Sequence, residues 1–144
     1  MTVAAILKQK GHDVVHVGPD ATIAEVAQQF AVRGIGAMIV SDDEGCLLGI
    51  ISERDVVRSL AAHGAETLGK TASELMTREI ITATERTTVP EAMEMMTMGR
   101  FRHLPVMHDG RINGIVSIGD IVKARMMQQE QEVDSLKAYV AGAA

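Results

Sequence analysis

The chain repeats itself, and this internal repeat constrains the fold more than any other feature of the sequence. An offset of 66 residues aligns residues 14–17 with residues 80–83, and after one extra residue in the first copy the offset becomes 65. The pairs that follow the extra residue include Ser52 with Ser117 and Asp55 with Asp120. Such self-similarity indicates one supersecondary unit used twice. Because each copy is too small to bury an adequate core alone, we expect the two copies to pack together and share one core.

The repeats divide the sequence into four segments. We assign the first repeat with its lead-in to residues 1–60, a linker to 61–70, the second repeat with its lead-in to 71–128, and a C-terminal helical tail to 129–144. The two lead-ins carry a leucine at similar places, Leu7 and Leu75.

Each copy predicts the element order β-α-β-β-α, so the expected fold class is α+β. A short β-rich run precedes a Thr-x-x-Glu capping box, Thr22–Glu25 or Thr88–Glu91, which starts an amphipathic helix. Gly34 or Gly99 ends this helix region. Two strands follow, joined by the hairpin turns 42–45 and 108–110, and a second helix begins near Glu53 or Gly119.

The last helix is predicted to extend past the second repeat, because residues 121–140 contain no glycine or proline. Its apolar residues look irregularly spaced: Met126, Met127, Val133, Leu136 and Val140. Two interpretations stay open, a semi-exposed arm whose tip contacts another subunit, and a solvated tail.

Composition excludes several classes of function. Three aromatic residues are too few for stacking on single-stranded nucleic acid, and a net charge of −5 argues against a phosphate-backbone footprint. No apolar run approaches the ~18 residues that span a bilayer. The single cysteine, Cys46, cannot form an internal disulfide, so we expect a reduced thiol in a cytoplasmic protein. The five histidines show no metal-ligand spacing.

Two matched segments could carry chemistry, Gly49–Asp55 and Gly114–Asp120. Each places a serine at the end of a strand and an aspartate three residues later, in the first turn of a helix. Such a pair can simply cap the helix. Alternatively, the free N–H groups of the helix N-terminus attract phosphate, while the aspartate accepts the two hydroxyls of a ribose.

The duplicated β-α-β-β-α pattern, these two segments and the run Arg102–Val106 resemble a tandem pair of cystathionine-β-synthase (CBS) domains, over roughly residues 1–128. The resemblance implies two repeats related by a pseudo-twofold axis, with two clefts between them that bind AMP, ADP, ATP, NAD or S-adenosylmethionine. It also implies a regulatory, energy-sensing role without catalysis, and homodimers. The second helices carry apolar residues for such a dimer: Val56, Val57 and Leu60, with Ile121 and Val122.

The same resemblance implies two sets of ligand-binding residues. The primary cleft combines Asp120 for ribose, Ser117, the phosphate-binding Arg102 and the adenine-contacting Ile115, Val15 and Ile35. The second cleft combines Asp55, Ser52, Arg54, Ile50, Ile81 and Phe101. Gly36 stands where the primary cleft has its arginine, so phosphate binding there depends on Arg54.

Two functions from different classes therefore remain. One is an adenosine-nucleotide sensor that regulates a separate, unidentified protein. The other is a ligand-independent dimerisation or docking module, in which the Ser-x-x-Asp segments serve only as helix caps.

Overall fold

The computed structural model describes the backbone of residues 1–143 and the side chains of residues 1–142. The chain forms two compact units. Unit 2 is residues 13–80, and unit 1 joins residues 1–12 to the chain from Ile81 onward. The same architecture recurs in both units, which confirms the predicted α+β class and the β-α-β-β-α order.

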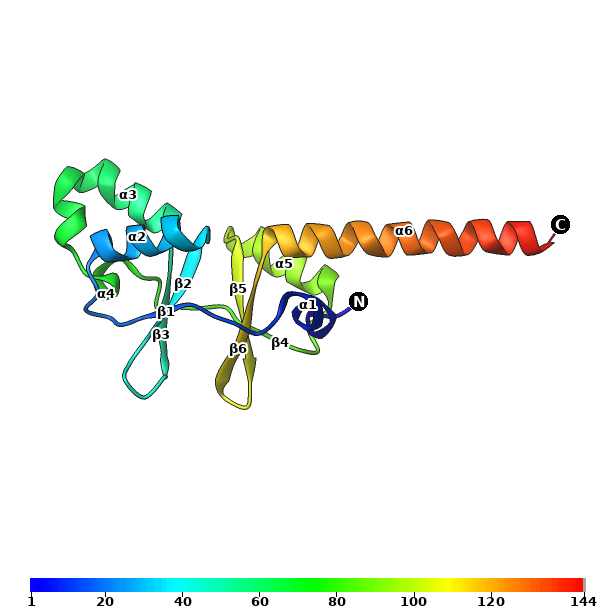
Figure 1. Cartoon of the computed structure of the whole chain (residues 1–144), viewed down its shortest axis with the longest axis horizontal. Helices are drawn as coiled ribbons and strands as arrows, with labels where there is room; N and C mark the ends of the chain where they lie inside the picture. The colour runs from blue at the N-terminus through cyan, green and yellow to red at the C-terminus, as the bar shows by residue number, and fades with distance from the viewer. Residues whose placement is uncertain (144) are drawn as a thin grey trace. The chain divides into compact units, whose positions relative to one another are not determined.

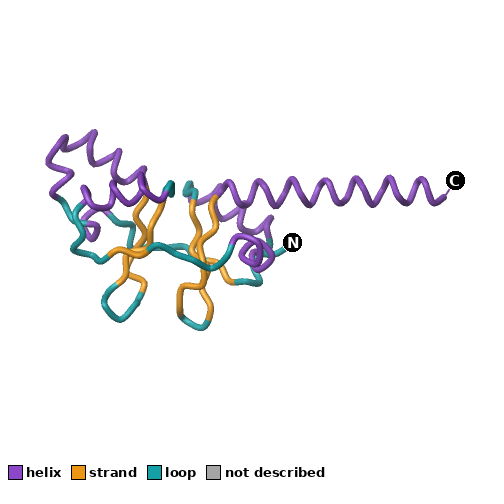
Figure 2. The backbone as a smooth tube through the Cα atoms, viewed as in Figure 1, coloured by secondary structure: helices purple, strands orange, loops and turns teal. Residues whose placement is uncertain are grey.

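Unit 2 contains a three-stranded sheet in the order β1-β2-β3 (Figures 1 and 2). β1 runs parallel to β2, and β2 pairs antiparallel with β3. The elements are β1 (His16–Val17), α2 (Ile23–Arg33), β2 (Ala37–Ser41), β3 (Leu47–Ser52), α3 (Glu53–His63), a 3₁₀ helix η1 (Gly64–Gly69) and α4 (Ala72–Leu75).

Unit 1 repeats this arrangement with a sheet in the order β4-β5-β6, in which β4 is parallel and β6 antiparallel to β5. The elements are α1 (Val3–Lys10), β4 (Ala83–Thr84), α5 (Val89–Gly99), β5 (His103–His108), β6 (Arg111–Ser117) and α6 (Ile118–Ala143). α6 continues from the end of β6 and projects away from the rest of unit 1 (Figure 1).

Local sequence signals set the helix starts as predicted. Thr22 and Thr88 each accept a hydrogen bond from the backbone of the glutamate three residues on, and each glutamate side chain accepts from the threonine N–H. Helix α2 ends at Gly34 in a left-handed conformation. Helix α5 ends at Gly99, as predicted, but here the residue in the left-handed conformation is the next one, Arg100. The Phe101 ring packs closely on Gly99, so a side chain at this position would require the ring to shift.

The predicted linker, residues 61–70, is also more ordered than expected. It contains the end of α3 and the 3₁₀ helix η1. Thr67 is fully buried, and its hydroxyl hydrogen-bonds that of Ser59 at 2.8 Å. This segment is therefore part of unit 2.

The two lead-in segments are exchanged between the repeats. α1, which precedes the first repeat, packs in unit 1 beside the second repeat, whereas α4 packs beside the first repeat in unit 2. A glycine in the last strand of each unit leaves space for the lead-in segment that packs on that strand. A Cβ on Gly114 would lie 2.7 Å from Leu7, and one on Gly49 would lie 2.9 Å from the carbonyl oxygen of Thr77.

The buried side chains form two clusters, one within each unit. The single core that the sequence predicts for the two repeats stays a prediction. One cluster lies in unit 1 and includes Leu7 and Leu104, and the other lies in unit 2 and includes Ile23 and Ile51. Each unit gains enough buried surface for its own core because it takes in a lead-in segment as well as a repeat.

Candidate functional site

The best-defined polar cluster lies where β6 ends and α6 begins. Ser117 donates from its backbone N–H to Oδ2 of Asp120 at 2.8 Å and from its hydroxyl at 3.0 Å. The backbone N–H of Asp120 donates in return to the serine hydroxyl at 3.2 Å. This reciprocal pattern is a capping box, so the capping role predicted for the pair is present.

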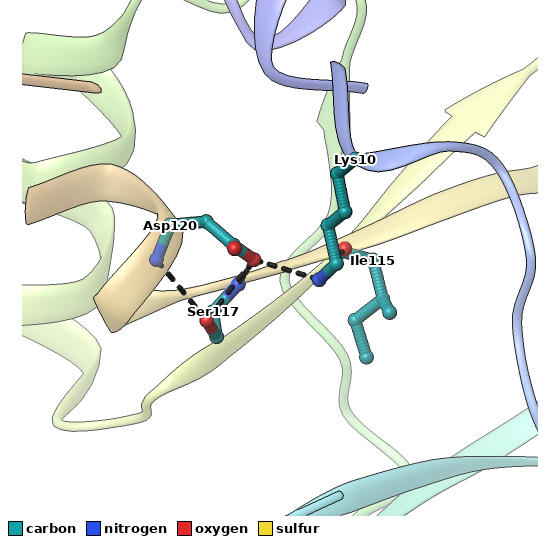
Figure 3. Close-up of polar contacts among 4 residues, drawn as sticks. All are labelled: Lys10, Ile115, Ser117 and Asp120. Carbon is teal, nitrogen blue, oxygen red and sulfur yellow. Dashed lines mark hydrogen bonds and ion pairs between the residues drawn. The ribbon is translucent and has the colours of Figure 1, made fainter. Parts of the chain in front are cut away.

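Lys10, at the end of α1, adds a cation to this cluster (Figure 3). Its Nζ lies 2.7 Å from Oδ2 of Asp120 and 2.8 Å from the carbonyl oxygen of Ile115. The donors from Ser117 and Lys10 therefore converge on one oxygen of the carboxylate. Oδ1 is the oxygen of Asp120 that these donors leave unused, and it could accept a ligand hydroxyl.

The surroundings of Asp120 keep its carboxylate ionised. Burial acts to raise its pKa, but the hydrogen bond from Lys10, the bonds from Ser117 and the charge of Lys10 outweigh burial, so the pKa lies below its ordinary value. The site thus offers an anionic oxygen beside a helix N-terminus, whose N–H groups favour negative ligand groups.

Arg102 lies at the same end of the sheet. Its carbonyl oxygen accepts a hydrogen bond from the backbone N–H of Ile118 at 2.8 Å, and the next residue, His103, pairs with Ser117 across the strands. The Arg102 residue itself is exposed. The structure therefore brings together four of the six residues predicted for the primary cleft: Asp120, Ser117, Arg102 and Ile115.

Unit 2 holds a corresponding cluster with less charge. The backbone N–H and hydroxyl of Ser52 donate to Oδ2 of Asp55 at 2.8 and 3.1 Å. The backbone N–H of Glu53 donates to the carbonyl oxygen of Gly36 at 3.0 Å, which repeats the bond made by Arg102. Ile50 is half-buried in β3, and Arg54 is exposed in the first turn of α3.

Two residues predicted for the primary cleft, Val15 and Ile35, belong to unit 2. Two residues predicted for the second cleft, Ile81 and Phe101, belong to unit 1. Val15 and Ile35 are half-buried and pack against the core of unit 2, while Phe101 packs against the core of unit 1. Ile81 is 48% exposed. The grouping of Val15 and Ile35 with Asp120, and of Ile81 and Phe101 with Asp55, stays a prediction.

Lys10 is the site residue that sequence reasoning missed. It lies in the lead-in before the first repeat, yet it contacts the second. One signal could have pointed to it, since the offset that aligns Leu7 with Leu75 also aligns Lys10 with Arg78. Arg78 donates to the hydroxyl and carbonyl oxygen of Ser73 instead. Both lead-ins therefore carry a basic residue at this position. Among the described residues, only the one in unit 1, Lys10, contacts the aspartate of the Ser-x-x-Asp segment.

A groove of about 230 Å³ in unit 1 reaches the Asp120 carboxylate. Its lining consists of Met1, Ala5, Ile6, Gln9, Lys10, Asp120, Lys123, Ala124 and Met127. Ligand pockets are commonly about 300–1,000 Å³, so this groove by itself is smaller than a usual ligand pocket.

Two other features, a metal site and a membrane-spanning helix, are absent from the described residues. No group of three or more His, Cys, Asp or Glu side chains there is arranged to hold a metal ion. Within the same residues, no helix has the length and apolar character needed to cross a membrane.

Comparison with known proteins shows where this architecture recurs. The family model described as "CBS domain" matches the chain twice, over residues 5–62 and 72–127. A relative named CBS domain-containing protein CBSX3, mitochondrial, from Arabidopsis thaliana is 33% identical over 149 residues, covering 98% of this chain and 72% of the relative.

Solved structures show the same fold. The CBS-domain containing protein ATU1752 from Agrobacterium tumefaciens is 46% identical with a TM-score of 0.85, covering 87% of this chain and 99% of the other. The CBS domain pair of protein MJ0100, solved in complex with 5′-methylthioadenosine and S-adenosyl-L-methionine, is 29% identical with a TM-score of 0.78. That match covers 89% of this chain and 98% of the other.

Proposed function

Because this chain belongs to the CBS-domain family and carries the domain in tandem, we propose that it is a regulatory module that binds an adenosine-containing ligand and signals to a separate protein. The observation that carries the proposal is the cluster at the start of α6. An ionised Asp120, a serine hydroxyl, a helix N-terminus and Arg102 lie together there. The complex of a relative with 5′-methylthioadenosine and S-adenosylmethionine supports the ligand class.

Each group has a role in this proposal. Asp120 accepts the ribose hydroxyls, and Arg102 with the N–H groups of α6 binds phosphate. Ile115, with Val15 and Ile35 from unit 2, contacts the adenine ring. The second site uses Asp55 for ribose, Ser52 and Arg54 at the phosphate side, and Ile50, Ile81 and Phe101 as apolar contacts. AMP, ADP, ATP and NAD are the ligands proposed, and competition among the first three would report the energy state of the cell.

The proposed module works without catalysis, as a cytoplasmic homodimer that regulates a partner still to be identified. The capping bonds of Ser117 and Ser52 favour one alternative, a docking module that needs no ligand. The two functions differ in ligand binding, so binding is the measurement that separates them.

Calorimetry and thermal unfolding with AMP, ADP, ATP, NAD, NADH and S-adenosylmethionine test the proposal, since a bound ligand stabilises the folded state by RT ln(1 + [L]/Kd). We expect the tightest ligand to lose at least tenfold in affinity in Asp120→Asn and less in Asp55→Asn. Asp109→Asn, in an exposed hairpin turn of unit 1, is the matched control. No binding by any ligand favours the docking function. Binding that survives in both Asp120→Asn and Asp55→Asn would contradict the assignment of the ligand sites to these two aspartates.

A further inference from the structure

The exposed face of α6 carries a regular apolar stripe. Its residues follow one another at alternating intervals of four and three positions, from Val122 to Val140. Its members are Val122, Met126, Gln129, Val133, Leu136 and Val140. All six are exposed, with Met126 56% and Leu136 63% accessible. This is the heptad repeat of a coiled coil, with Met126, Val133 and Val140 at a positions and Val122, Gln129 and Leu136 at d positions.

The stripe differs from the face with which α6 packs on its own unit. Ile121 and Ala124 make that contact and are 1% and 5% exposed. A shallow apolar groove of about 550 Å³ runs along the beginning of the stripe. It is lined by Ile118, Gly119, Val122, Lys123, Met126, Met127 and Glu130. Within the described residues, every side chain from 129 to 142 is exposed.

We propose that this stripe is one half of a parallel, two-stranded coiled coil formed with a second copy of this chain. A β-branched residue at a with leucine at d favours two parallel strands, and Val133 with Leu136 provides that pair. Gln129 is the one polar residue of the stripe. It would face Gln129 of the partner subunit only in the in-register parallel arrangement. A buried polar pair of this kind fixes register.

The flanking charges favour the same arrangement. In a parallel pair, each g residue lies beside the e residue of the following heptad on the other chain. Arg125 therefore faces Glu130 of the partner subunit, and Glu132 faces Lys137 of the partner subunit. Both contacts join opposite charges, and each occurs twice because the dimer has a twofold axis. In an antiparallel pair whose stripes overlap along their whole length, Glu130 would instead lie beside Glu130 of the partner subunit, and the two carboxylates would repel each other.

Helix physics supplies the reason for such a pairing. An isolated helix of about 12–15 residues is marginal in water, and most helical stability in proteins comes from packing an apolar face. The segment beyond residue 128 gains little burial from the rest of unit 1, because all its described side chains are exposed. Pairing of two α6 helices buries the stripe on both. The pairing needs no ligand, and it gives the homodimer of the proposed function a defined interface.

The first test is the mass of the full chain in solution, measured by light scattering without nucleotide at micromolar concentration. We expect twice the chain mass of 15.4 kDa. Val133→Asp and Leu136→Asp should raise the dissociation constant at least 100-fold. Ala138→Asp, on the opposite face of the same exposed helix, should leave it within threefold. A monomeric parent protein, or a dimer that persists in both aspartate variants, overturns the proposal.

The second test separates parallel from antiparallel pairing. In a Cys46→Ser background, Gln129→Cys should oxidise to a disulfide-linked dimer, because only the parallel in-register arrangement brings the two sulfurs together. Glu132→Lys should weaken the dimer about tenfold, and adding Lys137→Glu should restore it. A Gln129→Cys protein that stays unlinked, or a double variant as weak as Glu132→Lys, contradicts the parallel arrangement.

Discussion

Lys10 and Asp120 lie 110 residues apart in the sequence, yet Nζ of the lysine is 2.7 Å from Oδ2 of the aspartate. The contact links the lead-in before the first repeat to the helix that ends the second. It also places a cation on the carboxylate to which we assign ribose binding. Stability and ligand binding should therefore both respond when this pair is changed.

Removal of the pair should lower stability in a pH-dependent way. Because the pKa of Asp120 lies below its ordinary value of 3.8 in the folded chain, its stabilisation is fully present above that value. The stabilisation is lost as pH falls through the lower folded pKa. Urea unfolding at pH 7 should therefore show Asp120→Asn as less stable than the parent, and the difference should shrink progressively as the pH falls below 3.8.

The ion pair itself should contribute modestly, since the Lys10 and Asp120 side chains are 36% and 24% exposed. A double-mutant cycle of Lys10→Met with Asp120→Asn should give a coupling of about 0.2–1 kcal/mol at pH 7. Lys8→Met, an exposed lysine of the same helix, serves as the control. A coupling that does not decrease as the pH falls below 3.8 would contradict the assigned ionisation.

Substitution of the capping serine should separate the two roles of the cluster. Ser117→Ala removes a hydroxyl that both donates to and accepts from Asp120, so the free energy of unfolding should fall by about 1 kcal/mol. If the site also binds ligand, affinity should fall in the same variant. Ser135→Ala, an exposed serine of the same helix, should change neither quantity. Lost stability with unaltered ligand affinity would assign Ser117 to capping alone.

Arg102 should discriminate between ligands by their charge. Arg102→Ala should weaken binding of AMP about tenfold to 100-fold, because it removes a charge-assisted contact with phosphate. Binding of the uncharged 5′-methylthioadenosine should change less than threefold. Calorimetry with both ligands gives the comparison, and Arg111→Ala, at the hairpin end of the same strand pair, is the control for net charge. Equal losses for both ligands would count against the phosphate role.

Gly49 should tolerate no side chain. Alanine there would place its Cβ 2.9 Å from the Thr77 carbonyl oxygen, which accepts a hydrogen bond from Ile50 N–H at 3.1 Å. We expect Gly49→Ala to lower the free energy of unfolding by about 1–3 kcal/mol. Gly18→Ala, which meets nothing within 4 Å, should be nearly neutral. Thermal or urea unfolding measures both, and equal stabilities would mean that the Met76–Thr77 segment moves aside freely.

Local patterns in the sequence were sufficient to predict the repeated fold. The capping boxes at Thr22 and Thr88 mark helix starts within a few residues, and the hairpins follow from glycines that take positive φ, such as Gly45 and Gly110. The same serine and aspartate spacing located the cluster at Ser117. Signals of this kind depend only on neighbours in the chain.

Features that depend on long-range packing could not be predicted in this way. Nothing in the residues around Lys10 indicates a partner 110 residues away. Likewise, the sequence alone does not show which faces of α6 are buried. Only once Ile121 is seen in the core, and Val122 outside it, does the 4-3 spacing of the apolar residues become apparent.

The exchange of the lead-ins has a consequence for the two halves of the chain. A half-length protein with one lead-in and the repeat that follows it would lack the lead-in that packs on its sheet. Two such molecules would complete each other by trading these helices. In the single chain the same exchange is intramolecular, so it takes place at a far higher effective concentration than between two separate halves.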